Sequence, residues 1–183
     1  MITLASPERC SGCTACKAIC PKQAITMVAD HEGFLRPQIN TETCIQCHAC
    51  ERVCPVLHPG KPDCTPTCYA ARTNDDALRL ASSSGGLFTE LARPILAEGG
   101  IVFGCVWEKP ALVAIHAKAE TEDELAAMRG SKYVQSDLRD TFREVKTALQ
   151  EGRKVLFSGT PCQIAGLNAF LGHHYDDLLL LRQ

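Results

Sequence analysis

The 183-residue sequence lacks several features that would place it in a large functional class. Its longest apolar runs, residues 101–107 and 178–181, are far shorter than the roughly 20 residues that a membrane-spanning helix needs. Its formal net charge is −2, so no excess of positive charge favours nucleic acid or an anionic membrane as a partner. No Ser–His–Asp set and no pair of carboxylates stands out as a hydrolytic centre. We therefore expect no membrane insertion and no nucleic-acid binding.

Cysteine, in contrast, is abundant: the chain has 12, and eight of them form one pattern twice. Each run reads C-x2-C-x2-C-x3-C-P, the spacing with which bacterial ferredoxins bind [4Fe–4S] clusters. In that pattern the fourth cysteine of each run binds the other cluster. The expected ligands of cluster 1 are Cys10, Cys13, Cys16 and Cys54, and those of cluster 2 are Cys44, Cys47, Cys50 and Cys20.

Two other interpretations of the cysteines are weaker. Paired C-x2-C motifs also bind zinc, but zinc does not explain a doubled four-cysteine run with proline at the same place. A disulfide framework needs a secreted chain, and residues 1–4 show neither a basic segment nor a long apolar one. So many thiols suit a reducing compartment, and we expect a cytoplasmic location.

The pattern predicts three parts: a two-cluster ferredoxin-type domain over residues 1–58, a stiff proline-rich linker over 59–67, and a second domain over 68–183. Between the cysteine runs, residues 24–28 and 34–39 alternate around a glycine-containing turn and predict a β-hairpin. Ile25, Ile39 and Ile45 are expected to shield the clusters from water.

Beyond residue 68, strand and helix patterns alternate. Strands are expected over residues 68–72, 101–107, 112–117, 154–157 and 177–181, and helices over 87–96, 121–128, 138–149 and 160–171. Pro94 is expected to kink or end the first of these helices. The predicted fold is an α+β ferredoxin-like two-cluster domain followed by an incomplete α/β domain with a partly parallel sheet. Because the last strand has no covering element after it, we expect a fragment or a short relative of longer chains.

Three segments of the second domain have residue types suited to binding or chemistry. Residues 82–86, Ser-Ser-Ser-Gly-Gly, precede a helix and can bind an anion, although such loops mostly just cap helices. Residues 130–136 form a second polar segment, which could equally be a plain loop. In the third, Thr160, Pro161 and Gln163 predict a helix start with Cys162 in its first turn, where the helix dipole favours a thiolate. The alternative for Cys162 is a buried structural cysteine.

Together with the cysteine runs and Asp30-x-x-Gly33-Phe34, these segments resemble the coenzyme F420 hydrogenase/dehydrogenase beta-subunit family over nearly the whole chain. The resemblance implies a ferredoxin-type domain followed by an FAD-binding α/β domain, which passes electrons between clusters, flavin and a carrier such as a deazaflavin. The implied flavin-site residues are Ser84, Gly85, Gly86, Ser131, Lys132, Tyr133 and Thr160. Cys162 is similar to one ligand of a further [4Fe–4S] cluster, but the family's downstream cysteines are missing here. A third cluster in this chain alone is therefore not expected.

The preferred hypothesis is an iron–sulfur flavoprotein that relays electrons as an oxidoreductase subunit of a larger complex. Its partner would be a redox protein or a deazaflavin- or nicotinamide-type carrier. Two alternatives remain: an electron-transfer module without flavin, whose α/β part serves as a docking surface, and a hydrolase in which Cys162 is the nucleophile and His173 the base. Cys64 and Cys68 have no expected role, and Cys105 is expected in the core.

Overall fold

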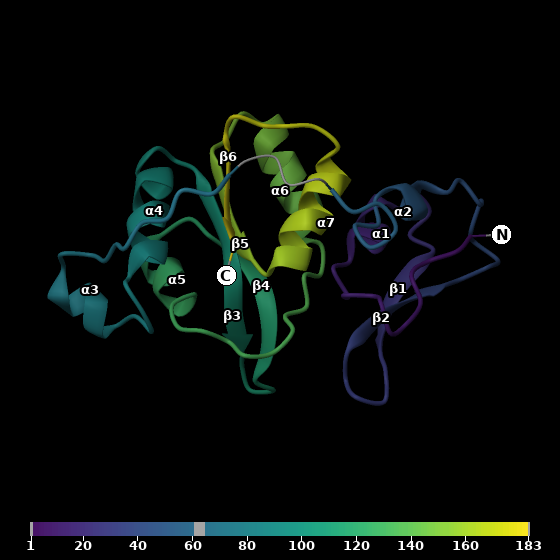
Figure 1. The fold of residues 1–183 in the computed structure, drawn as a ribbon, viewed down its shortest axis with the longest axis horizontal. Helices are drawn as coiled ribbons and strands as arrows, with labels where there is room; N and C mark the ends of the chain where they lie inside the picture. The colour runs from purple at the N-terminus through teal and green to yellow at the C-terminus, as the bar shows by residue number, and fades with distance from the viewer. Residues whose placement is uncertain (1, 61–64, 183) are drawn as a thin grey trace.

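The structure is a computed structural model that describes residues 2–60 and 65–182. It is a mixed α/β fold with two sheets, a two-stranded one and a four-stranded one. The cysteine-rich part lies at one end of the molecule, next to α6 and α7, and α3 (Asp76–Leu80) lies at the other end (Figure 1). No helix within the described ranges is both long and apolar enough to cross a membrane.

The cysteine-rich part contains the predicted hairpin. Strands β1 (Ile25–Ala29) and β2 (Leu35–Ile39) pair antiparallel, with Ile25 opposite Ile39. Asp30 closes the turn, because its Oδ1 accepts the N–H groups of Glu32 and Phe34 at 3.0 and 2.9 Å. Its Oδ2 lies 3.0 Å from Arg36 Nε, which gives Asp30 a structural role.

The sequence repeat is also a repeat in the backbone. Helix α1 (Ala15–Ile19) and helix α2 (Ala49–Arg52) each begin directly after a residue in the left-handed region, Thr14 (φ 62°) and His48 (φ 58°). Two residues earlier, Gly12 and Gln46 also have positive φ, 66° and 51°. The chain thus bends in the same way around both cysteine runs.

The four-stranded sheet has the order β4-β3-β5-β6. Strands β3 (Ile101–Glu108) and β4 (Val113–Ala119) form an antiparallel pair, whereas β5 (Val155–Gly159) runs parallel to β3 and to β6 (Leu178–Arg182). All five residues of β5 are buried, as expected for a central parallel strand covered on both faces.

Alternate residues of the central strands enter two cores. Phe103, Val155 and Phe157 pack with helices α6 (Thr141–Gln150) and α7 (Pro161–Leu171), while Val102 and Leu156 pack with α4 (Leu87–Ala97) and α5 (Glu122–Ala127). The capping box expected for α5 is present: Thr121 Oγ1 accepts Glu124 N–H, and the Glu124 carboxylate accepts Thr121 N–H.

One expectation about the second half was wrong: residues 68–72 form no strand and are exposed. The helix expected over residues 87–96 is present as α4 (Leu87–Ala97), and it continues past Pro94, so of the two effects expected of this proline, a kink or an end, it does not end the helix. Pro94 is exposed, so the carbonyl that loses its N–H partner one turn earlier can be hydrated.

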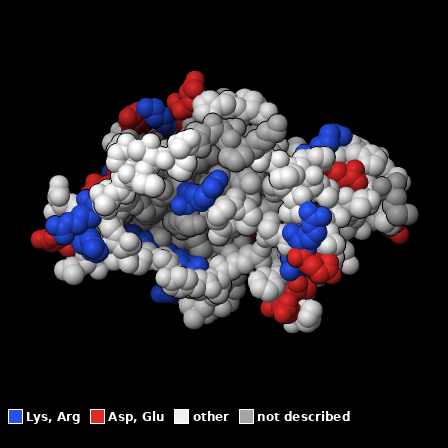
Figure 2. Space-filling view, in the orientation of Figure 1, with Lys and Arg blue, Asp and Glu red and all other residues white. Residues whose placement is uncertain are grey.

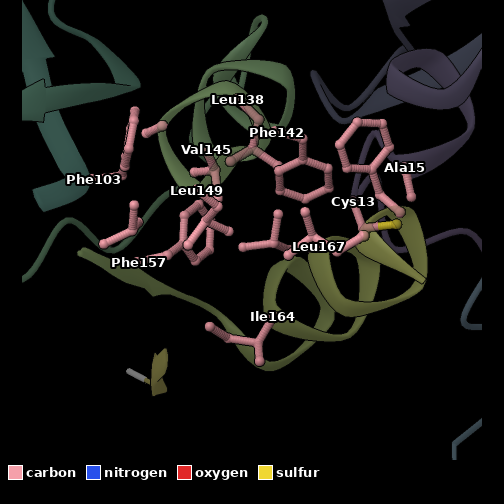
Figure 3. Close-up of a cluster of buried hydrophobic side chains, with 14 of the residues drawn as sticks. Cys13, Ala15, Phe103, Leu138, Phe142, Val145, Leu149, Phe157, Ile164 and Leu167 are labelled. Carbon is pink, nitrogen blue, oxygen red and sulfur yellow. The ribbon is translucent and has the colours of Figure 1, made fainter. Parts of the chain in front are cut away.

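The larger core continues into the cysteine-rich part. Buried Cys13, Ala15 and Val53 belong to the same cluster as Phe142, Val145 and Leu167, and Figure 3 shows Cys13 and Ala15 beside Leu167. A Cβ on Gly166 of α7 would lie 3.1 Å from Cys13 Cβ and Sγ, so this glycine lets α7 approach the first cysteine run.

Of the predicted linker, residues 61–64, with Cys64, lie outside the described residues.

Candidate functional site

The first cysteine cavity contains the four cysteines assigned to cluster 1. Cys10, Cys13, Cys16 and Cys54 all line it, so a residue of the second run completes the first set. The cavity has a volume of about 370 Å³, counting the space open to solvent. Its remaining wall is mostly apolar: Leu4, Ala5, Met27, Pro37 and Val56.

The second cysteine cavity, of about 330 Å³, repeats this arrangement with Cys20, Cys44, Cys47 and Cys50. The three isoleucines expected to shield a cluster, Ile25, Ile39 and Ile45, all line it. Ala24 N–H donates to Cys20 Sγ at 3.3 Å, the kind of bond that tunes a cluster's potential. Each cavity therefore gathers three cysteines of one run and the fourth of the other.

The donor chemistry of these cavities suits iron–sulfur cubes. Burial raises the pKa of the Cys13 thiol to about 11 and that of Cys16 to about 12. Burial alone therefore keeps these thiols protonated, and a positively charged metal centre is needed to stabilise them as thiolates. Among the residues that the structure describes, no three His, Cys, Asp or Glu side chains are arranged to hold a single ion. Sulfurs that surround a cavity instead of a point fit a four-iron cluster better than one zinc ion.

A cleft at the start of α4, here the α4 cleft, contains four of the seven expected flavin residues. Ser84, Gly85, Gly86 and Ser131 line its volume of about 1060 Å³, together with Arg129 and Arg182. Ser83 Oγ lies 3.3 Å from Ser131 Oγ, which joins the two polar segments across the cleft. Within the described residues no N-cap side chain bonds to the start of α4. Its first N–H groups and the nearby guanidinium groups therefore suit an anion.

The glycines of the α4 cleft have a packing reason. A Cβ on Gly85 would lie 2.9 Å from Ala71 O, and one on Gly86, at φ +78°, would lie 2.7 Å from Thr73 Cγ2. Thr73 N–H also donates to Gly85 O at 2.8 Å. The glycines let the loop pack on residues 71–73, which fixes the N-terminus of α4 beside the cleft.

A second cleft, here the Cys10 cleft, contains the other three expected flavin residues, Lys132, Tyr133 and Thr160. Its volume is about 1070 Å³, and Cys10, Ser11 and Phe34 of the cysteine-rich part form its opposite wall. Tyr133 is 93% exposed. Figure 2 shows a hollow in the α/β part with Lys and Arg side chains beside it.

Lys132 is committed to its own loop. Its Nζ donates to Met128 O and Arg129 O, each at 2.9 Å, at the end of α5. Burial lowers the pKa of this lysine. The two clefts meet at this loop because Ser131 lines one and Lys132 the other.

Comparison with known families agrees with both halves of this geometry. Residues 9–57 match the family described as 4Fe-4S dicluster domain, and residues 68–142 match the family described as coenzyme F420 hydrogenase/dehydrogenase, beta subunit N-term. The chain thus has a 4Fe-4S dicluster region followed by a region similar to the N-terminal part of the coenzyme F420 hydrogenase/dehydrogenase beta subunit. No curated protein matches it.

The beta-subunit match includes every expected flavin residue except Thr160, and it ends before the start of α7. Cys162, in the first turn of α7, lies 3.2 Å from Thr160 Oγ1 and 3.9 Å from Ser11 O. Within the described ranges no set of three possible ligands surrounds it. His173 is not a base for Cys162, because it lies beyond Gly172 at the far end of an 11-residue helix, with its ring centre 4.2 Å from that of Tyr175.

The sequence did not reveal two features of the site, the contact made by Gln135 and a buried hydrogen-bond chain. Gln135 joins the two matched regions, residues 68–142 and residues 9–57. Its Nε2 donates to Ser11 O and its Oε1 accepts Leu35 N–H, both at 3.1 Å. It lies in the polar segment 130–136, which was the available signal.

Cys105, expected in the core, is only half-buried.

The other missed feature is a buried hydrogen-bond chain around His116. Its ring stacks on Phe157, and Nε2 donates to Ser158 O at 2.9 Å. Ser136 Oγ, 2.9 Å away, therefore donates to Nδ1 and accepts from Gln163 Nε2 at 2.9 Å. Burial lowers the pKa of His116, which favours the neutral ring that this hydrogen-bond arrangement uses. Because Gln163 Oε1 accepts Thr160 N–H at 2.9 Å, the chain holds the loop before α7 in place.

Proposed function

We propose that the chain relays single electrons through two [4Fe–4S] clusters to or from FAD bound in the α/β part. The matches to a 4Fe-4S dicluster domain and to the beta-subunit N-terminal region support the iron–sulfur electron-transfer role. The observation that carries the flavin half is that Cys10 lines both the first cysteine cavity and the Cys10 cleft. A ligand of cluster 1 would thus form part of the wall against which the flavin lies. Short separations of this kind favour electron transfer over side reactions.

The two clefts divide the flavin between them in this proposal. The diphosphate would lie in the α4 cleft, held by the N-terminal N–H groups of α4, Ser131 and Arg129. The ring would lie in the Cys10 cleft, where Phe34 and the exposed Tyr133 offer apolar surface. Thr160 and Cys162 would face its polar edge.

When bound, a flavin converts single electrons into a two-electron hydride transfer. The chain's own residues would hold it, exclude water and fix its distance from Cys10, with Gln135 clamping the loop. The natural carrier would be a deazaflavin- or nicotinamide-type molecule, and the chain would act as an oxidoreductase subunit beside a redox partner protein.

Anaerobic purification tests the proposal. We expect about eight iron and eight sulfide per chain, together with FAD fluorescence after denaturation. Tyr133→Ala should weaken FAD retention at least tenfold with iron unchanged, since stacking on an aromatic ring is lost. The matched control is Tyr69→Ala, because Tyr69 is similarly exposed (86%) and lines neither cleft.

Full iron without any released FAD would contradict the flavin half and favour the simpler electron-transfer module, with the α/β part as a docking surface. A colourless, iron-free protein made without oxygen would contradict both.

A further inference from the structure

A third open region lies between α1 and α6, on the side of the second cysteine cavity. We call it the α6 groove. Its volume is about 840 Å³, and its lining residues are Ala18, Ile19, Cys20, Pro21, Gln23, Arg143, Lys146, Thr147, Gln150 and Phe170. Cys20 and Pro21 also line the second cysteine cavity. The α6 groove therefore adjoins cluster 2 through Cys20, as the Cys10 cleft adjoins cluster 1 through Cys10.

The charges on the α6 groove have one sign. Arg143 and Lys146 line it, and none of its lining residues is a carboxylate. Lys146 Nζ lies 5.5 Å from the centre of the Phe170 ring, which holds the ammonium group over the groove. Arg143 Nε donates to Ala18 O at 3.0 Å, and its Nη2 lies 3.5 Å from Cys20 O. Asp140, which does not line the groove, lies 3.6 Å from Arg143 and is mostly exposed.

The chemistry of the groove favours a protein over a small anion. Its lining combines apolar side chains, Ala18, Ile19 and Phe170, with polar ones, and its two cations both lie on α6. The groove adjoins the C-terminal end of α1, where Arg143 donates to the carbonyls of Ala18 and Cys20, so these backbone groups are acceptors that do not bind a phosphate. Apolar surface beside long cationic side chains is typical of a protein interface with electrostatic steering.

We propose that the α6 groove is the docking site of an acidic redox protein that exchanges electrons with cluster 2. This inference rests on the proposed function, in which cluster 1 serves the flavin and cluster 2 needs its own exchange route. In each step one electron leaves the partner's redox centre and reduces cluster 2 by one electron, or the reverse, and no bond or proton moves. The partner's carboxylates would pair with Lys146 and Arg143 and place its redox centre beside Cys20.

The test uses the anaerobic holoprotein and a small acidic [2Fe–2S] ferredoxin as the probe. We expect saturable binding at low salt that weakens at least tenfold between about 10 and 150 mM salt, because contacts between opposite charges are screened. Carbodiimide coupling followed by peptide mapping should join Lys146 to a carboxylate of the probe.

Charge-changing variants identify the surface. Lys146→Glu should weaken binding at least tenfold, and so should Thr147→Glu, which adds a negative charge at an exposed position in the groove without removing a cation. Lys109→Glu is the matched control, because this exposed lysine lies in the turn between β3 and β4 and lines none of the three clefts or grooves described here. Iron content, FAD content and the melting temperature of each variant should equal those of the parent protein.

Equal affinity for the parent and both groove variants, coupling sites elsewhere, or no binding of the ferredoxin at low salt would overturn the proposal. Inorganic phosphate that binds in a Lys146-dependent way while the ferredoxin does not would assign the groove to a small anion instead. These outcomes are separate from a failure of the proposed function, which would show as missing iron or FAD in the parent protein before any probe is added.

Discussion

The two cysteine runs share one backbone and have different surroundings. Both bend through left-handed residues at equivalent positions, Gly12 and Thr14 in the first and Gln46 and His48 in the second. In the first run, residues 12–15 are all buried, against α7 and Gln135. In the second run, residues 46–49 are exposed or half-buried, and the neighbouring Ile45 is 57% exposed.

This difference separates what the cluster requires from what the neighbouring domain requires. The bend follows from the ligand spacing and not from residue type, because it occurs with Gly12 and with Gln46, and likewise with Thr14 and with His48. The small side chain at position 12 is required by the docking of the α/β part. The loop of the first run is therefore internal beside the Cys10 cleft, whereas the loop of the second run is external at the second cysteine cavity. This difference agrees with our proposal that cluster 1 serves the flavin and cluster 2 an outside partner.

Removing a crossed ligand should have the largest effect. Cys54→Ser should abolish cluster 1 and Cys20→Ser cluster 2, and each should lower iron from about eight to about four per chain. The remaining electron paramagnetic resonance signal of Cys54→Ser should match that of Cys10→Ser, and the signal of Cys20→Ser should match that of Cys47→Ser. Cys68→Ser, at an exposed cysteine outside both cavities, is the control. If Cys54→Ser matched Cys47→Ser instead, the ligands would not cross between the runs.

The next largest effect should come from Gly12→Ala. The added Cβ would meet the Gln135 side chain and lie 2.9 Å from Leu35 O, at φ +66°. We expect the α/β part to separate from the first run, with a loss of about 2–4 kcal/mol from left-handed strain and overpacking together. Gly33→Ala is the matched control, because Gly33 also has positive φ (+88°) but no atom within 4 Å of the added Cβ, so only about 1–2 kcal/mol should be lost. Anaerobic thermal unfolding measures both, and equal losses would show that position 12 is limited by φ alone.

Gln135→Leu should have a smaller effect at the same contact. It removes two hydrogen bonds of 3.1 Å, worth about 1–3 kcal/mol together, and leaves Leu35 N–H without its partner. Hydrogen exchange should therefore become faster at the Leu35 amide, while the amides of α7 stay protected. Gln38→Leu, on the exposed face of the same strand, should leave that amide unchanged. Unaltered exchange in Gln135→Leu would mean that Gln135 does not hold the hairpin.

The sequence predicted those features that local spacing determines. The hairpin, the α5 capping box and the strands around Phe103 and Phe157 all depend on residues whose type and spacing act directly. The two crossed ligand sets stay a prediction, with which the lining of the two cysteine cavities agrees. The seven residues expected at a flavin site come from three segments, 84–86, 131–133 and the loop before α7, and they divide between the α4 cleft and the Cys10 cleft. The sequence did not reveal this division, because the adjacent residues Ser131 and Lys132 line different clefts.

The remaining features depend on contacts between distant segments, which spacing does not reveal. Residues 68–72 have strand-like composition but no neighbour to pair with, and Pro94 is tolerated because its side of α4 faces water. His116 had no partner visible in sequence, since its partners Ser136 and Ser158 come from segments 20 and 42 residues away.

The smallest predicted effect is on the pH dependence of stability, and it comes from the buried His116. Burial lowers its pKa below the ordinary value of 6.5, so the unfolded chain takes up a proton first as the pH falls. Stability from the neutral ring is therefore full above about pH 6.5 and declines below it, by at most about 1.4 kcal/mol per pH unit. His116→Gln, which keeps an amide near the hydrogen-bonding position without a titrating group, should flatten this decline. The measurement is the melting temperature of both proteins between pH 7.5 and 5.5 without oxygen, taken as a difference so that other titrating groups cancel. Parallel curves would show that the pKa of His116 is the same in the folded and the unfolded chain, as for a solvated ring, and would remove the hydrogen-bond chain that we assign to the loop before α7.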